Sequence, residues 1–199
     1  MTDPRSEEFQ AFVFKNRGTL LAIPAAVLAA FGKPSATSVA VGLPLAIAGE
    51  LVRCWAVGYS GVTTRGDHVE APKLVTAGPY AHVRNPLYVG NFITALGFGI
   101  AFTGKNSFGE KLALLGASLG TMAAVYATII PHEEQFLHSQ FGEDFERYCE
   151  RVPPLVPQAE PAAEQHGSWD PSVIKEAETR TFATFGAMFA VLLLKTLKA

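Results

Sequence analysis

Polar side chains that could do chemistry gather in two segments of the sequence. The first segment, residues 73–90, contains an Asn85-Pro86 pair that predicts the start of a helix, because Asn is a favoured N-cap and Pro a favoured first helical residue. A helix start leaves backbone N–H groups that can hold the polar end of a ligand. Four side chains of the segment could add hydrogen bonds to such a ligand: Tyr80, His82, Arg84 and Tyr88. The same residues are also typical of a capped turn at a membrane surface, with the tyrosines in an aromatic belt.

The second segment, residues 131–157, begins with two carboxylates, Glu133 and Glu134, where an apolar stretch ends. Carboxylates there could accept hydrogen bonds from ribose hydroxyls or pair with an ammonium or sulfonium group, and they are equally typical of a solvated helix start. Further along, apolar residues recur every three or four positions. This spacing predicts a pair of amphipathic helices interrupted at Gly142, with these residues on the apolar face: Leu137, Phe141, Phe145, Tyr148 and Val152.

Several other classes of site are not expected. His132 and His138 are six residues apart, so they do not share a helix face, and we predict no metal site. The formal net charge is −2 and no stripe of Lys or Arg is present, which argues against nucleic acid. Cys54 and Cys149 lie far apart in different surroundings and are interpreted as free thiols.

The distribution of charge predicts how these segments are held. Of the 199 residues 49% are hydrophobic and 17% charged, and the charges are sparse in five apolar stretches. We predict an all-α, polytopic membrane bundle of about five transmembrane helices with a small cytoplasmic lobe, because a span needs roughly 20 apolar residues. The expected spans are 19–31 with an extension upstream to Phe9, then 36–59, 87–102, 111–130 and 182–197.

Some features of these stretches leave alternatives open. The first could be a signal peptide, although its leader carries Glu7 and Glu8, and the last could lie along the lobe. Glu50 and Arg53 are three residues apart on one helical face, so they could pair in the second span, or Arg53 could approach a polar head or cofactor. A small-residue face at Gly116 and Gly120 predicts close helix packing in the fourth span.

Counting Lys and Arg in alternate loops favours an N-terminus in the cytoplasm. The inner side then holds ten such residues and the outer side five. The inner residues are Arg5, Lys15, Arg17, Arg65, Lys73, Arg84, Arg147, Arg151, Lys175 and Arg180, and the outer ones are Lys33, Lys105, Lys111, Lys195 and Lys198. Residues 63–88 and 131–151, which carry the chemistry, would both face the cytoplasm.

Together the two segments resemble the signature of the isoprenylcysteine carboxyl methyltransferase and phospholipid methyltransferase superfamily. The resemblance covers residues 53–157 and rests on an ordered set: Arg53 and Trp55, Gly78-Pro79-Tyr80, the run from Val83 to Gly90, Glu133-Glu134, Phe141-Gly142, Tyr148, Val152-Pro153 and Pro157. Two departures bear on the methyl acceptor. Eukaryotic isoprenylcysteine members usually have His where this chain has Asn85, and Tyr and Arg where it has Phe145 and Pro154.

The resemblance implies an integral membrane methyltransferase that uses S-adenosylmethionine. Its cofactor pocket would lie in the C-terminal half, closed by the membrane-exit helices and open sideways to lipid. The cofactor-binding residues it implies are Val75, Gly78, Tyr80, His82, Val83, Arg84, Asn85, Leu87, Tyr88 and Glu133. The expected partners are a lipophilic or lipid substrate and the surrounding membrane lipids, with no nucleic acid and no obligatory protein partner.

The methyl acceptor decides which residues are expected to be catalytic. A carboxylate of isoprenylcysteine type needs a cation beside it, for which Arg151 is the first candidate and Arg84 the second. A phospholipid amine needs a base, for which Glu134 is the candidate. An NADPH-dependent reductase of sterol type and a membrane scaffold without activity remain as alternatives from other classes.

We expect one domain over residues 1–199. Its parts would be two membrane helices in 1–59, a cofactor-binding catalytic core in 60–157, a Pro-rich linker in 158–180 and a C-terminal apolar helix in 181–199.

Overall fold

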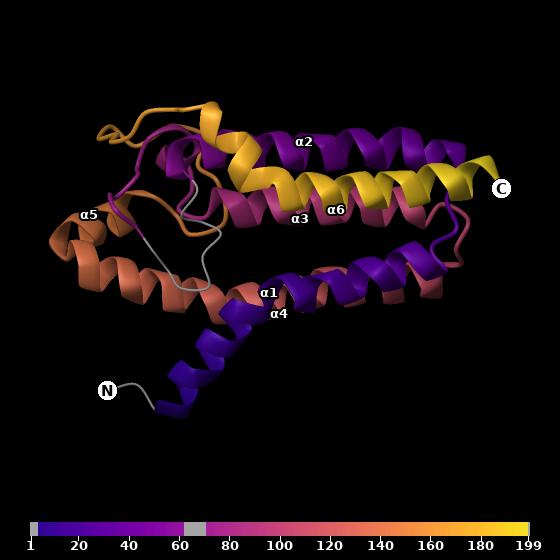
Figure 1. Ribbon diagram of the computed structural model, residues 1–199, viewed down its shortest axis with the longest axis horizontal. Coiled ribbons are helices and arrows are strands. Elements are labelled where there is room, and N and C mark those ends of the chain that lie inside the picture. Colours follow the sequence, from indigo (N-terminus) through magenta and orange to yellow (C-terminus); the bar gives the residue numbers. More distant parts are fainter. Residues whose placement is uncertain (1–3, 62–70, 199) are drawn as a thin grey trace. The chain divides into compact units, whose positions relative to one another are not determined.

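The computed structural model describes residues 4–61 and 71–198, with side chains from residue 8 onward. All regular structure in these ranges is helical, which confirms the predicted all-α class (Figure 1). Arg65 and Thr63, which entered the sequence interpretation, lie outside the described residues, as does the side chain of Arg5. The elements are α1 (Pro4–Phe31), α2 (Ala36–Ser60), the short 3₁₀ helix η2 (Gly78–Ala81), α3 (Pro86–Phe102), α4 (Phe108–Phe141), α5 (Glu143–Arg151) and α6 (Ser172–Leu197).

The helices confirm an integral membrane protein with several spans. Four are long and apolar enough to cross a bilayer: α2, α4, α6 and the part of α1 from Glu8 to Phe31. The fifth predicted span coincides with α3, which is apolar but has only 17 residues. At 1.5 Å per residue it is about 25 Å long, slightly less than the roughly 30 Å of a typical hydrocarbon core.

Helix α4 is longer than the sequence pattern predicts. We expected the span to end near Ile130 and a separate helical segment to follow, but α4 continues through Pro131 to Phe141. Proline removes one backbone donor from the helix, and here that loss does not end it. The predicted interruption at Gly142 is confirmed, since this residue has a φ of 53° and α5 begins directly after it.

Helix α6 begins at Ser172, inside the segment expected to be a linker, so the prediction of a linker over 158–180 is wrong at its C-terminal end. Asp170 accepts hydrogen bonds from the Ser172 hydroxyl at 2.6 Å and from its backbone N–H at 2.9 Å. These bonds lower the pKa of the Asp170 carboxyl and fix the start of the helix. Hydropathy did not reveal this start because the first turns of α6 are polar.

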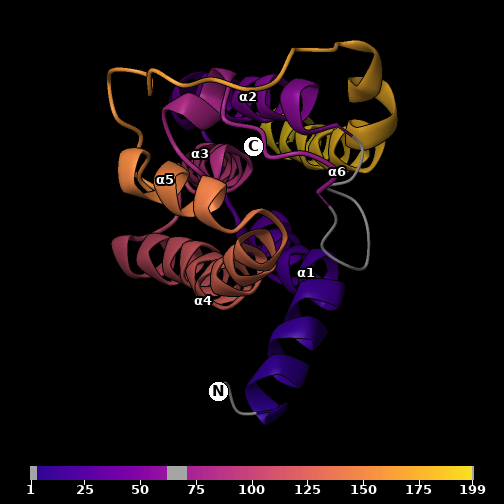
Figure 2. The ribbon, with the colours of Figure 1, turned by 90° about the vertical axis from the view of Figure 1, so that its left-hand side faces the viewer.

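The chain divides into two compact units, and the boundaries between them fall within helices. Unit 1 comprises residues 1–15, 52–89 and 126–179, and unit 2 comprises residues 16–51, 90–125 and 180–199. All of the residues singled out above for chemistry belong to unit 1. In that unit α5 lies alongside the C-terminal end of α4 (Figures 1 and 2), and Phe145, Tyr148 and Val152 form a small apolar core with Leu137 and Phe141.

Unit 2 packs through the backbones of α2 and α3. A Cβ added to Gly42 would lie 2.4 Å from the backbone nitrogen of Ala101, and one added to Gly97 would lie 2.3 Å from that of Ala46. Such an approach is possible only for glycine. Added Cβ atoms at Gly116 and Gly120 would meet no described atom within 4 Å, so among the described residues the close approach in unit 2 uses Gly42 and Gly97 instead.

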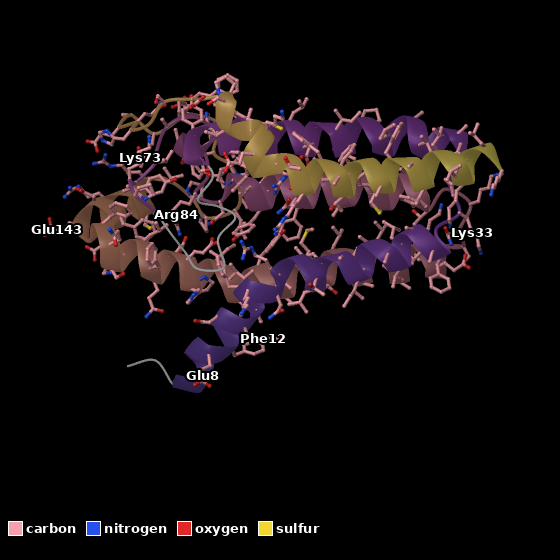
Figure 3. The ribbon with its side chains drawn as sticks, viewed as in Figure 1. Glu8, Phe12, Lys33, Lys73, Arg84 and Glu143 are labelled. Atoms are coloured by element: carbon pink, nitrogen blue, oxygen red, sulfur yellow. The ribbon has the colours of Figure 1, made fainter. Side chains whose placement is uncertain are left out.

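The polar end of unit 2 ties three helices together. Lys33, which is labelled in Figure 3, forms an ion pair with Glu110 at 2.8 Å, and the Lys195 ammonium donates to the carbonyls of Ala30 and Gly32. Because the last carbonyls of a helix lack intrahelical donors, Lys195 of α6 stabilises the end of α1.

Candidate active site in unit 1

The 3₁₀ helix η2 is seated on the end of α2 by Gly78. This residue has a φ of 63°, a conformation that favours glycine, and a Cβ at its position would lie 2.2 Å from the ring of Tyr59. Gly78, which we expected to bind the cofactor, is therefore also required for the conformation of this turn. The turn that it permits carries Tyr80 and leads to His82.

The hydroxyl groups of two tyrosines are enclosed near this turn. Tyr148 of α5 donates its hydroxyl to the backbone carbonyl of Tyr80 at 2.8 Å. Burial raises the pKa of both phenols, that of Tyr80 to about 12. Both are therefore protonated at neutral pH and can act as hydrogen-bond donors.

Arg84, which is labelled in Figure 3, joins its own segment to α4 and to the end of α5. Its Nε and Nη2 lie 2.9 and 2.8 Å from Oε1 of Glu134 on α4, so the guanidinium forms an ion pair there. Its Nη1 donates to the carbonyls of Val152 at 2.7 Å and Cys149 at 3.2 Å, at the end of α5. Only 13% of the side chain is exposed, and Arg is suited to such a position because its donors form a rigid fork.

Glu133, the neighbour of Glu134, has a different partner. Tyr88 donates its hydroxyl to Oε1 of Glu133 at 2.7 Å, and the Tyr88 ring lies 4.3 Å from that of Tyr126. Adjacent residues on a helix point about 100° apart, so α4 presents its two carboxylates to two different residues of the segment around Pro86. The hydroxyl of Tyr88 is thus used inside the protein, which does not favour the aromatic-belt interpretation.

The predicted helix start at Asn85-Pro86 is confirmed, since α3 begins at Pro86. The Asn85 carbonyl accepts the N–H groups of Tyr88 at 3.1 Å and Val89 at 3.2 Å. Its side-chain amide donates to the carbonyl of Pro154 at 3.1 Å. Asn85 and Pro154 are two of the positions that depart from the usual isoprenylcysteine pattern, and they are in direct contact.

A tail of residues 152–171 runs back over η2. Four backbone hydrogen bonds, at intervals of four residues along the tail, connect it to residues 58–82. The N–H groups of Gln158, Ala162 and Asp170 donate to the carbonyls of His82, Ala81 and Gly58, respectively. The His166 carbonyl accepts the Thr76 N–H, and all four distances lie between 2.8 and 3.0 Å. Nδ1 of His82 lies 2.9 Å from the Gln158 carbonyl. Because a carbonyl only accepts, Nδ1 carries the proton. Sequence reasoning missed this tail, because its hydrogen bonds use backbone groups that any residue type supplies.

The remaining predicted residues differ in how closely they join this cluster. Val83 is 3% exposed and therefore buried, whereas Val75 and Leu87 are half-buried. Arg151 stands apart: it is exposed at the end of α5 and forms an ion pair with Glu164 of the tail at 2.5 Å. The structure thus brings Arg84 and Glu134 together, while the contact of Arg151 leads to the tail.

Arg53 has a partner that the sequence spacing did not suggest. Its Nη2 lies 2.8 Å from both carboxylate oxygens of Glu178 on α6, and both side chains are buried. Glu178 was missed because it stands in a segment expected to be a linker. Among the described residues, no three His, Cys, Asp or Glu side chains come together in a way that could hold a metal ion.

The segment that carries these contacts matches a known family. Residues 37–144, more than half of the chain, match the phospholipid methyltransferase family. The chain belongs to this family. The match ends just after Gly142, so the tail and α6 lie beyond it.

Relatives of this family member carry two kinds of name. The chain is 40% identical over 84 residues to the cobalt-zinc-cadmium resistance protein CzcN of Cupriavidus metallidurans. The matched region covers 42% of this chain and 35% of that protein. It is 40% identical over 87 residues to the protein-S-isoprenylcysteine O-methyltransferase of Schizosaccharomyces pombe, covering 42% and 34%. It is 31% identical over 116 residues to a probable protein-S-isoprenylcysteine O-methyltransferase of Oryza sativa, covering 56% and 57%.

In each case the chain spans well under two thirds of the length of its relative. No solved structure matches this chain significantly.

Proposed function

We propose that this protein transfers a methyl group from S-adenosylmethionine to a lipophilic carboxylate of isoprenylcysteine type. Membership of the phospholipid methyltransferase family and relatives named protein-S-isoprenylcysteine O-methyltransferase support the reaction class. The observation that carries the proposal is the pair of adjacent carboxylates on α4. Tyr88 holds Glu133 and Arg84 holds Glu134, so both are fixed beside the start of α3.

The donor set around η2 fits S-adenosylmethionine, which when bound supplies an electrophilic methyl group on a sulfonium. Glu133 is a half-buried carboxylate of the kind that accepts hydrogen bonds from ribose hydroxyls or an ammonium group. Backbone N–H groups at the start of α3, near Asn85 and Leu87, suit a carboxylate. The other residues that we assign to the cofactor lie on η2 or near it: Val75, Gly78, Tyr80, His82, Val83, Arg84 and Tyr88.

The acceptor requires little activation by the protein. A carboxylate is already nucleophilic at neutral pH, so positioning and exclusion of water account for most of the catalysis. Arg151 is our candidate for the cation that positions it. Its ion pair with Glu164 is exposed, with 43% and 65% of the side chains accessible, and exposed pairs open at little cost. Arg84 is less available because Glu134 and two carbonyls engage it.

Binding in detergent tests the cofactor. The protein is titrated calorimetrically with S-adenosylhomocysteine, with NADPH as a parallel control. We expect binding of S-adenosylhomocysteine and none of NADPH. Binding of NADPH alone would instead favour a reductase of sterol type.

Methyl transfer tests the acceptor. Labelled S-adenosylmethionine is offered with N-acetyl-S-farnesylcysteine, and the methyl ester of the same compound is the control because it lacks the free carboxylate. We expect label only in the first reaction. Label in neither, while phosphatidylethanolamine vesicles become labelled, would reassign the acceptor.

A phospholipid amine is the second candidate acceptor, because the matched family is named for phospholipid methylation. Glu134 would then take up the proton of the amine, and its ion pair with Arg84 would have to open for this. Glu134→Gln distinguishes the two reactions. It should abolish amine methylation but leave a residual rate with the carboxylate.

A further inference from the structure

The tail ends in an exposed tryptophan that rests on the last turn of α2. Trp169 is 48% exposed, yet a Cβ added to Gly58 would lie 2.0 Å from its Nε1 and 2.4 Å from its Cδ1. The five-membered ring of the indole therefore packs against the backbone of α2, and the rest of the side chain stays accessible. Trp169 lies beyond the residues that match the family and takes no part in the candidate active site described above. Its position is fixed by the protein while its exposed part is available to another molecule.

The depth of Gly58 in a membrane follows from α2 and from the tail. With 25 residues α2 is about 37 Å long, whereas the hydrocarbon core is roughly 30 Å thick and the bilayer with its headgroups roughly 40–45 Å. Asp170 is exposed and donates its N–H to the Gly58 carbonyl at 2.8 Å. Placing an exposed carboxylate in hydrocarbon is costly, so this end of α2 lies outside the core. Gly58, and Trp169 with it, is therefore at the level of the headgroups.

The neighbours of Trp169 belong to the same boundary. Trp55 is 44% exposed and stands three residues before Gly58 on α2, which is about 4.5 Å further from the end of this candidate span. On the other side, α6 begins at Ser172 and is itself a candidate span. Tryptophan is enriched where a bilayer meets water, because its ring has an apolar body and a polar N–H. The end of α2 thus carries two exposed tryptophans where an aromatic belt is expected.

We propose that Trp169 anchors the tail in the headgroup region of the membrane, with phospholipid as its partner. The exposed part of the indole contacts the headgroups and the upper acyl chains, while Gly58 holds the opposite side. Four backbone hydrogen bonds join the tail to residues 58–82, so the anchor also fixes η2 at the membrane surface. The contact with lipid does not depend on which cofactor or methyl acceptor the protein uses.

Fluorescence quenching tests the anchor, because the chain has only two tryptophans and Trp55→Phe leaves Trp169 as the single one. The variant is reconstituted into phosphatidylcholine vesicles that carry a nitroxide either on the headgroup or near the end of an acyl chain. We expect the headgroup nitroxide to quench Trp169 at least about twofold more strongly than the deep one. Trp169→Phe is the matched control. It leaves Trp55, which lies deeper along α2, so the same ratio should be smaller.

Three results would overturn the inference. Quenching by iodide but by neither nitroxide would place Trp169 in water, and stronger quenching by the deep nitroxide would place it in hydrocarbon. Protection from all three quenchers would mean that protein covers the indole. Circular dichroism and thermal unfolding establish that both variants are folded. Should Trp55→Phe not fold, the difference between the wild-type signal and that of Trp169→Phe reports on Trp169 by the same criteria.

Discussion

At the scale of single residues, the candidate site depends on side chains that combine structural and chemical tasks. Arg84 closes the end of α5 and also holds Glu134. The sequence could predict that Arg84, Tyr88 and the two glutamates belong together, because their types and order match a signature. It could not predict which pairs form, since the directions of Glu133 and Glu134 depend on the continuation of α4 through Pro131.

Glu133→Ala should weaken the binding of S-adenosylhomocysteine while the protein stays folded. The change removes the carboxylate that we assign to the cofactor and that Tyr88 holds at 2.7 Å. A lost hydrogen bond between the cofactor and a charged group typically costs about 1.5–3 kcal/mol, or roughly ten- to a hundredfold in affinity. Calorimetry in detergent measures it. Gln135→Ala, at an exposed neighbouring position, is the control, and equal affinities in the two variants would remove Glu133 from the site.

Gly78→Ala should lower the stability of the protein. The new Cβ would meet the Tyr59 ring at 2.2 Å, and alanine disfavours a φ of 63°, so we expect a loss of about 1–3 kcal/mol. Thermal unfolding in detergent measures it against Gly186→Ala, where an added Cβ meets no described atom within 4 Å. A melting temperature for Gly78→Ala equal to that of the control would mean that the turn relaxes without cost.

At the scale of elements, hydropathy predicted the helices but not that α4 continues to Phe141 or that α6 begins at Ser172. A helix that leaves the membrane keeps its backbone hydrogen bonds while its side chains become polar, so composition changes where secondary structure does not. Gly142 was predictable because a positive φ requires a residue type that the sequence shows. Ser172 was not, because its signal is the single cap Asp170 next to a proline.

The cap at Asp170 predicts a pH dependence for the stability of α6. Hydrogen bonds from the Ser172 hydroxyl and N–H lower the pKa of this carboxyl in the folded protein. A lowered pKa stabilises the fold above the unfolded pKa, and the contribution is lost as the pH falls through the folded value. Asp170→Asn should therefore melt below wild type at pH 7, and the difference should narrow toward pH 3. A constant difference across this range would show that the carboxyl charge plays no part.

At the scale of the whole molecule, the membrane class followed from the distribution of charge, while the path of the chain through the bilayer depends on α3. Four helices can span by length, and α3 is the short fifth. If α3 spans, the segment around Lys73 and the loop around Lys105, which lie on either side of it in the chain, face opposite sides of the membrane. If it does not, both face the same side.

Thiol labelling in intact cells decides this path and with it the side of the candidate active site. In a background with Cys54→Ser and Cys149→Ser, Lys73→Cys and Lys105→Cys each provide one exposed thiol for a membrane-impermeant maleimide. The excess of Lys and Arg predicts that Lys105→Cys reacts from outside and Lys73→Cys reacts only after permeabilisation. The reverse pattern would place the segment around Lys73, and the candidate active site that follows it, outside. Protection of both until permeabilisation would mean that α3 does not cross, and that the lipophilic substrate reaches unit 1 over a helix lying within one leaflet.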